Sequence, residues 1–314
     1  MTADRPSADR PSADRLSADR PSADRPAPSG ERPATVGPAG VPGRLDAVPE
    51  TALWTLYHRA LEARRPDTLL PDPKAVELVD RLDYPFEQRF GSGALQAQLQ
   101  ALRVACFDRE VADFLARKPR GTVVCLGEGL ETQYWRVDNG RARWLSVDLP
   151  ESVALRQELL PPGPRQRYLA ADATDLGWAD EVDRDHGVLI TAQGLLMYLP
   201  PPQVRDLIAA CAERFPGGSL VLDAVPRWFS HLTLNGRMGA HGYQVPPMPW
   251  AMDAGERARL RTVSPAVTGV RDVRPVGGRG LVGALLPLAL TVPPLATRRP
   301  SVTVLEFAER RRRA

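Results

Sequence analysis

Residues 123–132 read VVCLGEGLET, an apolar run that ends in a turn with two glycines. A short apolar run bounded by glycine predicts a buried strand of a parallel sheet. Gly127 and Gly129 allow the main chain to approach a ligand closely, because glycine has no side chain in the way. In open α/β sheets, ligands bind at the carboxyl ends of the strands. The stretch therefore predicts a ligand site at the end of this strand.

A second strand followed by an acid lies downstream, in residues 144–151, WLSVDLPE. Asp148 falls at the predicted end of this strand, where a carboxylate can accept hydrogen bonds from the cis hydroxyls of a ribose. The dinucleotide fingerprint GxGxxG would need a third glycine at the position of Thr132, and the chain has no GxxxxGK[ST] loop. These absences disfavour a phosphate-bearing ligand. A nucleoside cofactor without phosphates remains, and S-adenosylmethionine fits that description.

Two further polar residues, like Asp148, lie at the ends of predicted strands. Asp172 comes just after a predicted third strand and can reach the amine of an adenine, and Gln193 closes a predicted fourth strand. Each alone is more often a solvated loop residue or a helix cap. One polar group at each of three successive strand ends, after a glycine turn, favours a cofactor site. The predicted cofactor-binding set is Arg103, Gly127, Glu128, Gly129, Asp148, Leu149, Asp172, Ala173 and Gln193.

Hydrophobic periodicity gives the fold class. Three helices, at 50–65, 72–84 and 94–117, precede the first strand, and Asp72 with Pro73 is a helix-start signal. Strands and helices then alternate, which predicts an α/β protein with a mostly parallel, doubly wound sheet. We expect a helical cap at 49–119, a cofactor-binding core at 120–225, a lid rich in glycine, proline and aromatics at 226–265, and C-terminal strands at 266–314.

The first 48 residues predict a disordered arm. Residues 3–27 contain five copies of a pentad of the type ADRPS, whose spacing matches neither helix nor strand. The N-terminus has no apolar leader-like run. Residues 280–296, GLVGALLPLALTVPPLA, are shorter than the roughly 20 residues of a membrane span and contain prolines. We expect them to be buried or to line a pocket.

Composition excludes several classes of partner. The net charge is +3, with basic and acidic residues interspersed, so no nucleic-acid or membrane surface is expected. The three cysteines, Cys106, Cys125 and Cys211, form no CxxC pair, which disfavours a disulfide scaffold and a zinc site. They are expected to be buried, reduced thiols in a cytoplasmic protein, and no metal is predicted.

The segments LGEGLETQYWRV, SVDLPE, AADATDLGW and AQGLLMYL together resemble the leucine carboxyl methyltransferase family. That family includes the protein phosphatase carboxyl methyltransferases and bacterial polyketide O-methyltransferases of the tetracenomycin type. The resemblance covers about Leu53 to Phe307. It implies a class I methyltransferase fold, with a seven-stranded sheet and an N-terminal helical cap, and S-adenosylmethionine as cofactor. It also implies that Arg103 pairs with the methionine carboxylate, for which a guanidinium fork is well suited.

The chain departs from the family pattern at three places. Glu131 and Gln133 stand where the family has Asp and Arg, and Gln193 stands where it has Glu, whereas Arg136 is retained. Because of these departures, a cofactor-binding regulatory or scaffold protein that has lost catalysis is an alternative function. An NAD-dependent oxidoreductase is a further alternative, which Thr132 disfavours. The preferred function is O-methylation of a carboxyl or phenolic hydroxyl on a small molecule such as a polyketide-like metabolite.

The acceptor side is less sharply defined by the sequence. An aromatic-rich lid suits a flat acceptor, or it packs the lid onto the core. Candidate substrate contacts are Tyr198, His231, His241 and Trp250. A carboxylate acceptor is already ionised and needs no base, whereas a phenol would be helped by one. No catalytic base is assigned.

Overall fold

The computed structural model describes residues 50–293 and 295–309. A seven-stranded sheet has the order β3-β2-β1-β4-β5-β9-β8, and its first five strands along the chain are parallel. Strand β9 runs antiparallel to both β5 and β8. The strands are β1 (Thr122–Leu126), β2 (Arg143–Asp148), β3 (Gln166–Ala170), β4 (Val188–Ala192), β5 (Ser219–Ala224), β8 (Val267–Val273) and β9 (Ser301–Phe307). The α/β, doubly wound class predicted from the sequence is confirmed.

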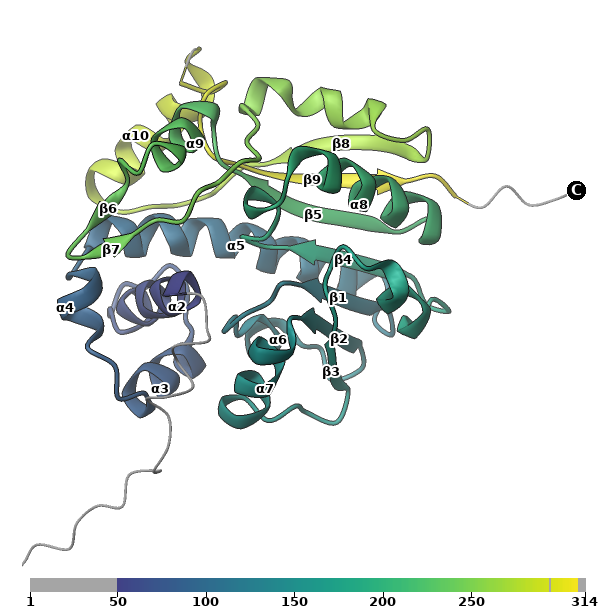
Figure 1. Ribbon diagram of the computed structural model, residues 1–314, viewed down its shortest axis with the longest axis horizontal. Helices are drawn as coiled ribbons and strands as arrows, with labels where there is room; N and C mark the ends of the chain where they lie inside the picture. The colour runs from purple at the N-terminus through teal and green to yellow at the C-terminus, as the bar shows by residue number, and fades with distance from the viewer. Residues whose placement is uncertain (1–49, 294, 310–314) are drawn as a thin grey trace, which may run out of the picture. The chain divides into compact units, whose positions relative to one another are not determined.

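Helices cover both faces of the sheet (Figure 1). Within β1, Val124 and Leu126 pack into one core cluster, while Val123 and Cys125 pack into the cluster on the opposite face. Burial on both faces explains why this strand is apolar throughout rather than alternating. The helices after β1 are α6 (Gln133–Val137), α7 (Pro150–Leu159) and α8 (Pro201–Arg214), with 3₁₀ segments η1 (Leu176–Glu181) and η2 (Leu196–Tyr198).

In the part of the chain that the structure describes, four helices precede the sheet. They are α2 (Glu50–Ala63), α3 (Pro73–Arg81), α4 (Phe86–Phe90) and α5 (Ala94–Arg117). The predicted start of α3 is confirmed, because Asp72 accepts a hydrogen bond from Ala75 N at 3.0 Å and Pro73 takes the first helical position. Helices α2, α3 and α4 pack around their own apolar cluster, which also includes Leu130 from the glycine turn. The cap is thereby packed directly against the loop that ends β1.

Residues 226–265 interrupt the alternation of strands and helices. They contain α9 (Arg227–Leu234), the two-residue strands β6 (Gly239–Ala240) and β7 (Tyr243–Gln244), and η3 (Ala254–Thr262). Trp250 N donates to Met197 O at 3.3 Å, and Met252 N donates to Val225 O at 3.0 Å. These hydrogen bonds hold residues 226–265 against the segments that follow β4 and β5.

Residues 280–293, 295 and 296 are not buried, contrary to the first of the two expectations for this segment. They begin with α10 (Gly280–Thr291), which has no buried residue among those the structure describes, and Leu281 is 80% exposed. Apolar composition could not predict this outcome, because burial depends on whether a sheet or helix face is left to cover. Here other helices already cover the faces of the sheet, and α10 lies at the periphery of the ribbon (Figure 1).

The three cysteines are free and buried, as predicted. Among the helices that the structure describes, none combines enough length and apolar character to cross a membrane. The predicted arm at residues 1–48 lies outside the described residues.

Candidate functional site

The glycine turn after β1 has the geometry that glycine alone adopts readily. Gly127 has φ of +60° and Gly129 has φ of +52°, both in the left-handed region. A Cβ atom on Gly127 would lie 2.8 Å from Cδ1 of Leu195, which is too close for real atoms. The turn therefore needs glycine both for its backbone angles and for the close approach of the loop after β4.

Asp148 joins the end of β2 to this turn. Its side chain is buried, Oδ2 accepts from Gly129 N at 2.7 Å, and Oδ1 accepts from Leu149 N at 2.8 Å. Each carboxylate oxygen has a second lone pair, so Asp148 can still accept hydrogen bonds from two hydroxyls. Next to it, Leu149 is 48% exposed and offers an apolar surface at the strand end. Both features fit a ribose with its base alongside.

Arg103 on α5 reaches the loop that follows β4. Its Nη1 donates to Asp223 Oδ2 at 2.7 Å, and Asp223 Oδ1 accepts from Gly194 N at 2.8 Å. The Nε atom of Arg103 is buried and has no hydrogen-bond partner within the described residues. An unpartnered guanidinium N–H beside the strand ends fits a ligand carboxylate. Sequence reasoning missed Asp223, although it also closes a strand, β5, with a polar residue.

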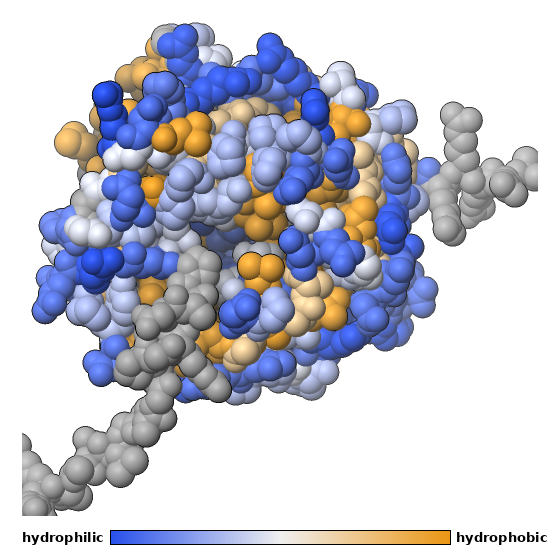
Figure 2. Space-filling view, in the orientation of Figure 1, coloured by the Kyte–Doolittle hydropathy of each residue, from blue (hydrophilic) through white to orange (hydrophobic). Residues whose placement is uncertain are grey.

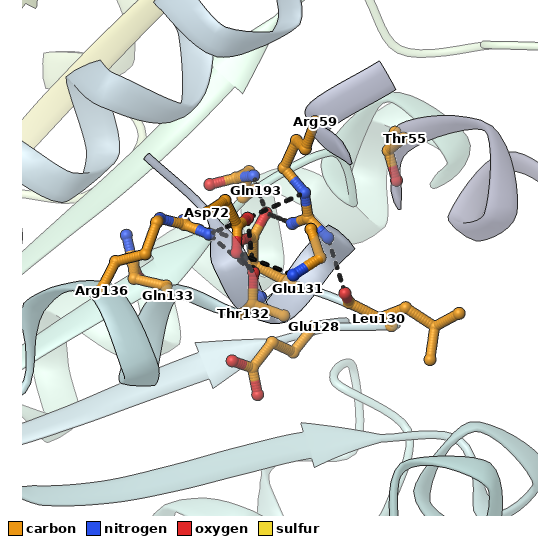
Figure 3. Close-up of polar contacts among 12 residues, drawn as sticks. Thr55, Arg59, Asp72, Glu128, Leu130, Glu131, Thr132, Gln133, Arg136 and Gln193 are labelled. Carbon is orange, nitrogen blue, oxygen red and sulfur yellow. Dashed lines mark hydrogen bonds and ion pairs between the residues drawn. The ribbon is translucent and has the colours of Figure 1, made fainter. Parts of the chain in front are cut away.

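Gln193 does not stand alone at the end of β4. Its Nε2 donates to Glu131 Oε2 at 2.7 Å, which leaves the amide oxygen without a bond among the described residues. Glu131 itself belongs to a buried cluster of charges, in which Arg59 of α2, Asp72 and Arg136 of α6 converge (Figure 3). The family departures at 131 and 193 thus face each other.

The buried cluster ties the cap to the glycine turn. Arg136 Nη1 lies 2.7 Å from Asp72 Oδ2, and Arg136 Nη2 lies 2.7 Å from Glu131 Oε1. Thr132 Oγ1 donates to the Asp72 carboxylate, with its two oxygens at 2.8 and 2.6 Å. Burial alone would raise the pKa of Glu131, but Arg59 and Arg136 more than offset burial and hold this pKa well below its usual range. Glu131 is therefore ionised at neutral pH.

Asp108 and Gln133 complete this cluster rather than the cofactor set. Gln133 Nε2 donates to Asp108 Oδ1 at 2.9 Å, and Arg136 Nε donates to Asp108 Oδ2 at 2.7 Å. Gln133 thereby keeps a donor where the family has an arginine. The cap helix α5 is fixed to α6 through these bonds of Asp108, which follows Arg103 along the same helix.

Two of the predicted cofactor residues have their side chains committed elsewhere. Glu128 is directed inward, where it pairs with Arg156 at 2.9 Å and accepts from Ser146, and burial raises its pKa. Asp172 is exposed, and its Oδ1 accepts from the backbone N and the hydroxyl of Thr174 at 2.7 and 2.8 Å. Oε1 of Glu128 has no hydrogen-bond partner in the part of the chain that the structure describes. Ala173 is buried beside Asp172.

The four candidate acceptor residues fall into separate places. Tyr198 is half-buried near Arg103 and Asp223, and burial raises its pKa to about 12. His231 and Trp250 share the lining of a cavity of about 380 Å³. His241 lies on the turn between β6 and β7, against Gly91, and does not line that cavity. The structure therefore brings two of the four together.

The predicted cofactor positions gather along one edge of the sheet. Gly127 and Asp148 meet at the ends of β1 and β2, and Gly194 and Leu195 bring the loop after β4 against Arg103 and Gly127. The strand order reverses between β1 and β4, which is where open α/β sheets bind ligands. Figure 2 shows a hollow in the middle of the face drawn. In residues 50–293 and 295–309, no group of three or more His, Cys, Asp or Glu side chains is arranged to hold a metal.

Comparison with known proteins places the chain in a family. The family model described as leucine carboxyl methyltransferase matches residues 52–212. The tetracenomycin polyketide synthesis O-methyltransferase TcmP of Streptomyces glaucescens is 33% identical over 186 residues, which cover 59% of this chain and 68% of that protein. The S-adenosyl-L-methionine-dependent methyltransferase dpfgK of Gibberella zeae is 27% identical over 210 residues, which cover 61% of this chain and 70% of that protein.

A solved structure supports the fold. A crystal structure of a protein from Thermobifida fusca aligns with a TM-score of 0.51 and 18% identity, over 85% of this chain and 98% of that chain. At this identity the match concerns the fold alone.

Proposed function

The chain belongs to the leucine carboxyl methyltransferase family, and from that premise we propose that it is an O-methyltransferase acting on a small molecule. It is an S-adenosyl-L-methionine-dependent methyltransferase by family. The acceptor that we propose is a carboxyl or phenolic oxygen of a compound with a flat, polyketide-like ring system. The observation that carries the site is the contact between Asp148 Oδ2 and Gly129 N, which joins the ends of two adjacent strands at the point where ligands bind.

The residues present fit this cofactor. Asp148 has free acceptor capacity for the ribose hydroxyls, and Leu149 offers an apolar surface for the base. Arg103 has one buried, unpartnered N–H for the methionine carboxylate. The amide oxygen of Gln193 can accept a hydrogen bond from the amino group. When bound, S-adenosyl-L-methionine supplies an electrophilic methyl group, whose bond to sulfur breaks as a bond to the acceptor oxygen forms.

The protein's own part is to position the acceptor and to exclude water. Tyr198 lies near Arg103 and Asp223, and its raised pKa keeps the phenol protonated at neutral pH. It is therefore a hydrogen-bond donor to the acceptor and not a base. A carboxylate acceptor needs no deprotonation, whereas a phenol would have to lose its proton to a group at the acceptor site or to water.

The NAD alternative is further disfavoured by Thr132. Its side chain is engaged with Asp72 and Arg136 in the buried cluster, at the position where a dinucleotide fold would need glycine for close packing against a pyrophosphate. The alternative without catalysis rests on Gln193, Glu131 and Gln133, and it differs from the proposal in turnover alone.

A methyl-transfer assay tests the proposal. The full chain is incubated with S-adenosyl-L-methionine labelled in the methyl group, together with hydroxynaphthoic acids, hydroxyanthraquinones and a peptide ending in leucine. We expect label in an aromatic acceptor, and mild alkaline hydrolysis then distinguishes a methyl ester from a methyl ether. Label in the peptide alone would replace the small-molecule proposal, and cofactor binding without transfer to any acceptor would support the regulatory alternative.

A further inference from the structure

A cavity of about 380 Å³ lies outside the predicted cofactor set. Its lining comes from α9, from the start of α8 and from the chain at 249–251, and none of the predicted cofactor residues belongs to it. Small-molecule sites in proteins have volumes of roughly 300–1,000 Å³. The cavity is therefore large enough for a compact ligand.

The walls of the cavity are held by hydrogen bonds. Ser230 Oγ of α9 donates to Met248 O at 2.6 Å, which fixes the helix to the chain that carries Trp250. Trp250 N donates to Met197 O at 3.3 Å, and Met197 is the neighbour of Tyr198 in the chain. One wall is thus joined directly to the segment that holds Tyr198 near Arg103 and Asp223.

The chemistry of the lining is asymmetric. Trp250, Leu234 and two prolines supply apolar and planar surface. Arg227 and His231 supply polar atoms, and the lining contains no acid. Arg227 Nε and Nη2 bind Glu256 at 2.7 and 3.0 Å, while Nη1 has no partner among the described residues. The imidazole of His231 likewise has none. The cavity therefore offers flat apolar walls and, at Arg227 and His231, a hydrogen-bonding end where the charge of Arg227 is paired with that of Glu256.

We propose that this cavity holds the body of the methyl acceptor, and that the acceptor is a planar aromatic compound with a second acidic oxygen group besides the one methylated. The second group lies toward Arg227 and His231, and the ring system packs on Trp250 and Leu234. The reacting oxygen then lies on the side of Tyr198. This inference rests on the proposed function for the identity of the ligand, and on the cavity for its shape and charge.

Calorimetry on the full chain with saturating S-adenosylhomocysteine tests the inference without turnover. The probe is 3-hydroxy-2-naphthoate, and 3-hydroxy-2-naphthamide is its neutral counterpart. We expect the carboxylate to bind at least about tenfold more tightly than the amide, because a hydrogen bond from Nη1 of Arg227 is stronger to a carboxylate than to a neutral amide. Arg227→Gln should remove most of this preference. Arg237→Gln, an equal charge change at an exposed residue outside the lining, should not.

Filling the cavity provides the second test. Ala251→Trp places an indole in the cavity and should weaken probe binding at least about tenfold while S-adenosylhomocysteine affinity stays within about twofold. Ala258→Trp, at an exposed position of η3, is the matched control and should leave both affinities unchanged. Thermal unfolding of each variant confirms that it is folded.

The outcomes separate this inference from the proposed function. Undiminished probe binding in Ala251→Trp, or an equal loss in Ala258→Trp, would overturn the cavity as the acceptor site even if the cofactor binds. Failure of S-adenosylhomocysteine to bind would instead overturn the proposed function. In that case, probe binding that is lost in Ala251→Trp but kept in Ala258→Trp would still support the cavity as a site for an acidic aromatic ligand.

Discussion

The guanidinium of Arg103 is held by the carboxylate of Asp223, with Nη1 2.7 Å from Oδ2. The other oxygen of Asp223 accepts from Gly194 N at 2.8 Å. One buried acid at the end of β5 therefore holds both Arg103 of the cap helix α5 and the loop after Gln193 in position. Asp223 acts on the cofactor site through Arg103, as a positioning residue.

Asp223→Ala should weaken S-adenosyl-L-methionine binding by about tenfold or more, because Arg103 loses the partner that orients it. Asp223→Asn keeps an acceptor for Gly194 and should bind more tightly than Asp223→Ala. Calorimetry measures both affinities, and Asp206→Ala on the exposed face of α8 serves as the control. A loss of thermal stability with wild-type affinity in both variants would show that Asp223 is merely structural.

Asp148→Ala should lose most of the cofactor affinity, because the carboxylate both orders the glycine turn and faces the ribose position. The variant also leaves Gly129 N and Leu149 N without acceptors, so we expect a loss of about 1–3 kcal/mol in the free energy of unfolding. Asp172→Ala is the comparison, with a smaller effect on affinity, because that carboxylate is exposed and already bound to Thr174. Calorimetry and urea unfolding measure the two effects. Unchanged affinity in Asp148→Ala would remove it from the site.

Arg136→Ala should destabilise the protein by about 3–5 kcal/mol, because it leaves Asp108 without its cation and leaves Asp72 and Glu131 with Arg59 alone. The side chain of Arg136 contacts Asp72, Asp108 and Glu131, and it is 5% exposed. Arg141→Ala, at an exposed position, should change stability by less than about 0.5 kcal/mol. Urea unfolding followed by circular dichroism compares them. Similar unfolding midpoints for the two variants would contradict the structural role of the cluster.

Stability should fall as the pH rises above about 9. Burial raises the pKa of Cys106 to about 11 and that of Cys211 to about 12, from an ordinary value of 9.0. Above pH 9 the unfolded chain ionises these thiols while the folded chain does not, so unfolding becomes easier until the folded pKa is passed. Unfolding midpoints in urea between pH 7 and 11 measure the effect, and Cys211→Ser should flatten it. A midpoint that rises over this range would contradict the burial of the thiols.

Leu285→Ser on α10 should change stability by less than about 0.5 kcal/mol, because this side chain is 54% exposed. Leu305→Ser on β9, where the side chain is fully buried, should cost several times more, since it leaves a cavity and a buried hydroxyl. Thermal unfolding compares the two. An equal loss would show that α10 is packed against the protein in solution.

The sequence predicted those features that depend on local pattern. The strand at 122–126, the long helix at 94–117 and the Asp72 cap follow from periodicity and from capping chemistry, and all three are present. The strand pattern also indicates that Gly129 and Asp148 lie near each other, because parallel strands end at one edge of the sheet. Predicting these features requires no knowledge of which distant segments of the chain are in contact.

Contacts between distant segments could not be predicted in the same way. Asp72 was recognised as a helix cap, but its second role with Thr132 and Arg136 depends on how α3 packs on the glycine turn. Likewise the pairing of Gln193 with Glu131 joins two substitutions that looked independent in the sequence. The exposure of α10 was mispredicted because apolar composition does not reveal whether a partner surface is available.

The measurement that tests the central claim most directly is calorimetric titration of the full chain with S-adenosyl-L-methionine and, separately, with NAD. We expect the first to bind at one site per chain and the second not to bind. Loss of the S-adenosyl-L-methionine signal in Asp148→Ala would then place that site at the ends of β1 and β2. Binding of NAD, or of neither compound by the folded protein, would contradict the assignment of this edge of the sheet as a methyl-donor site.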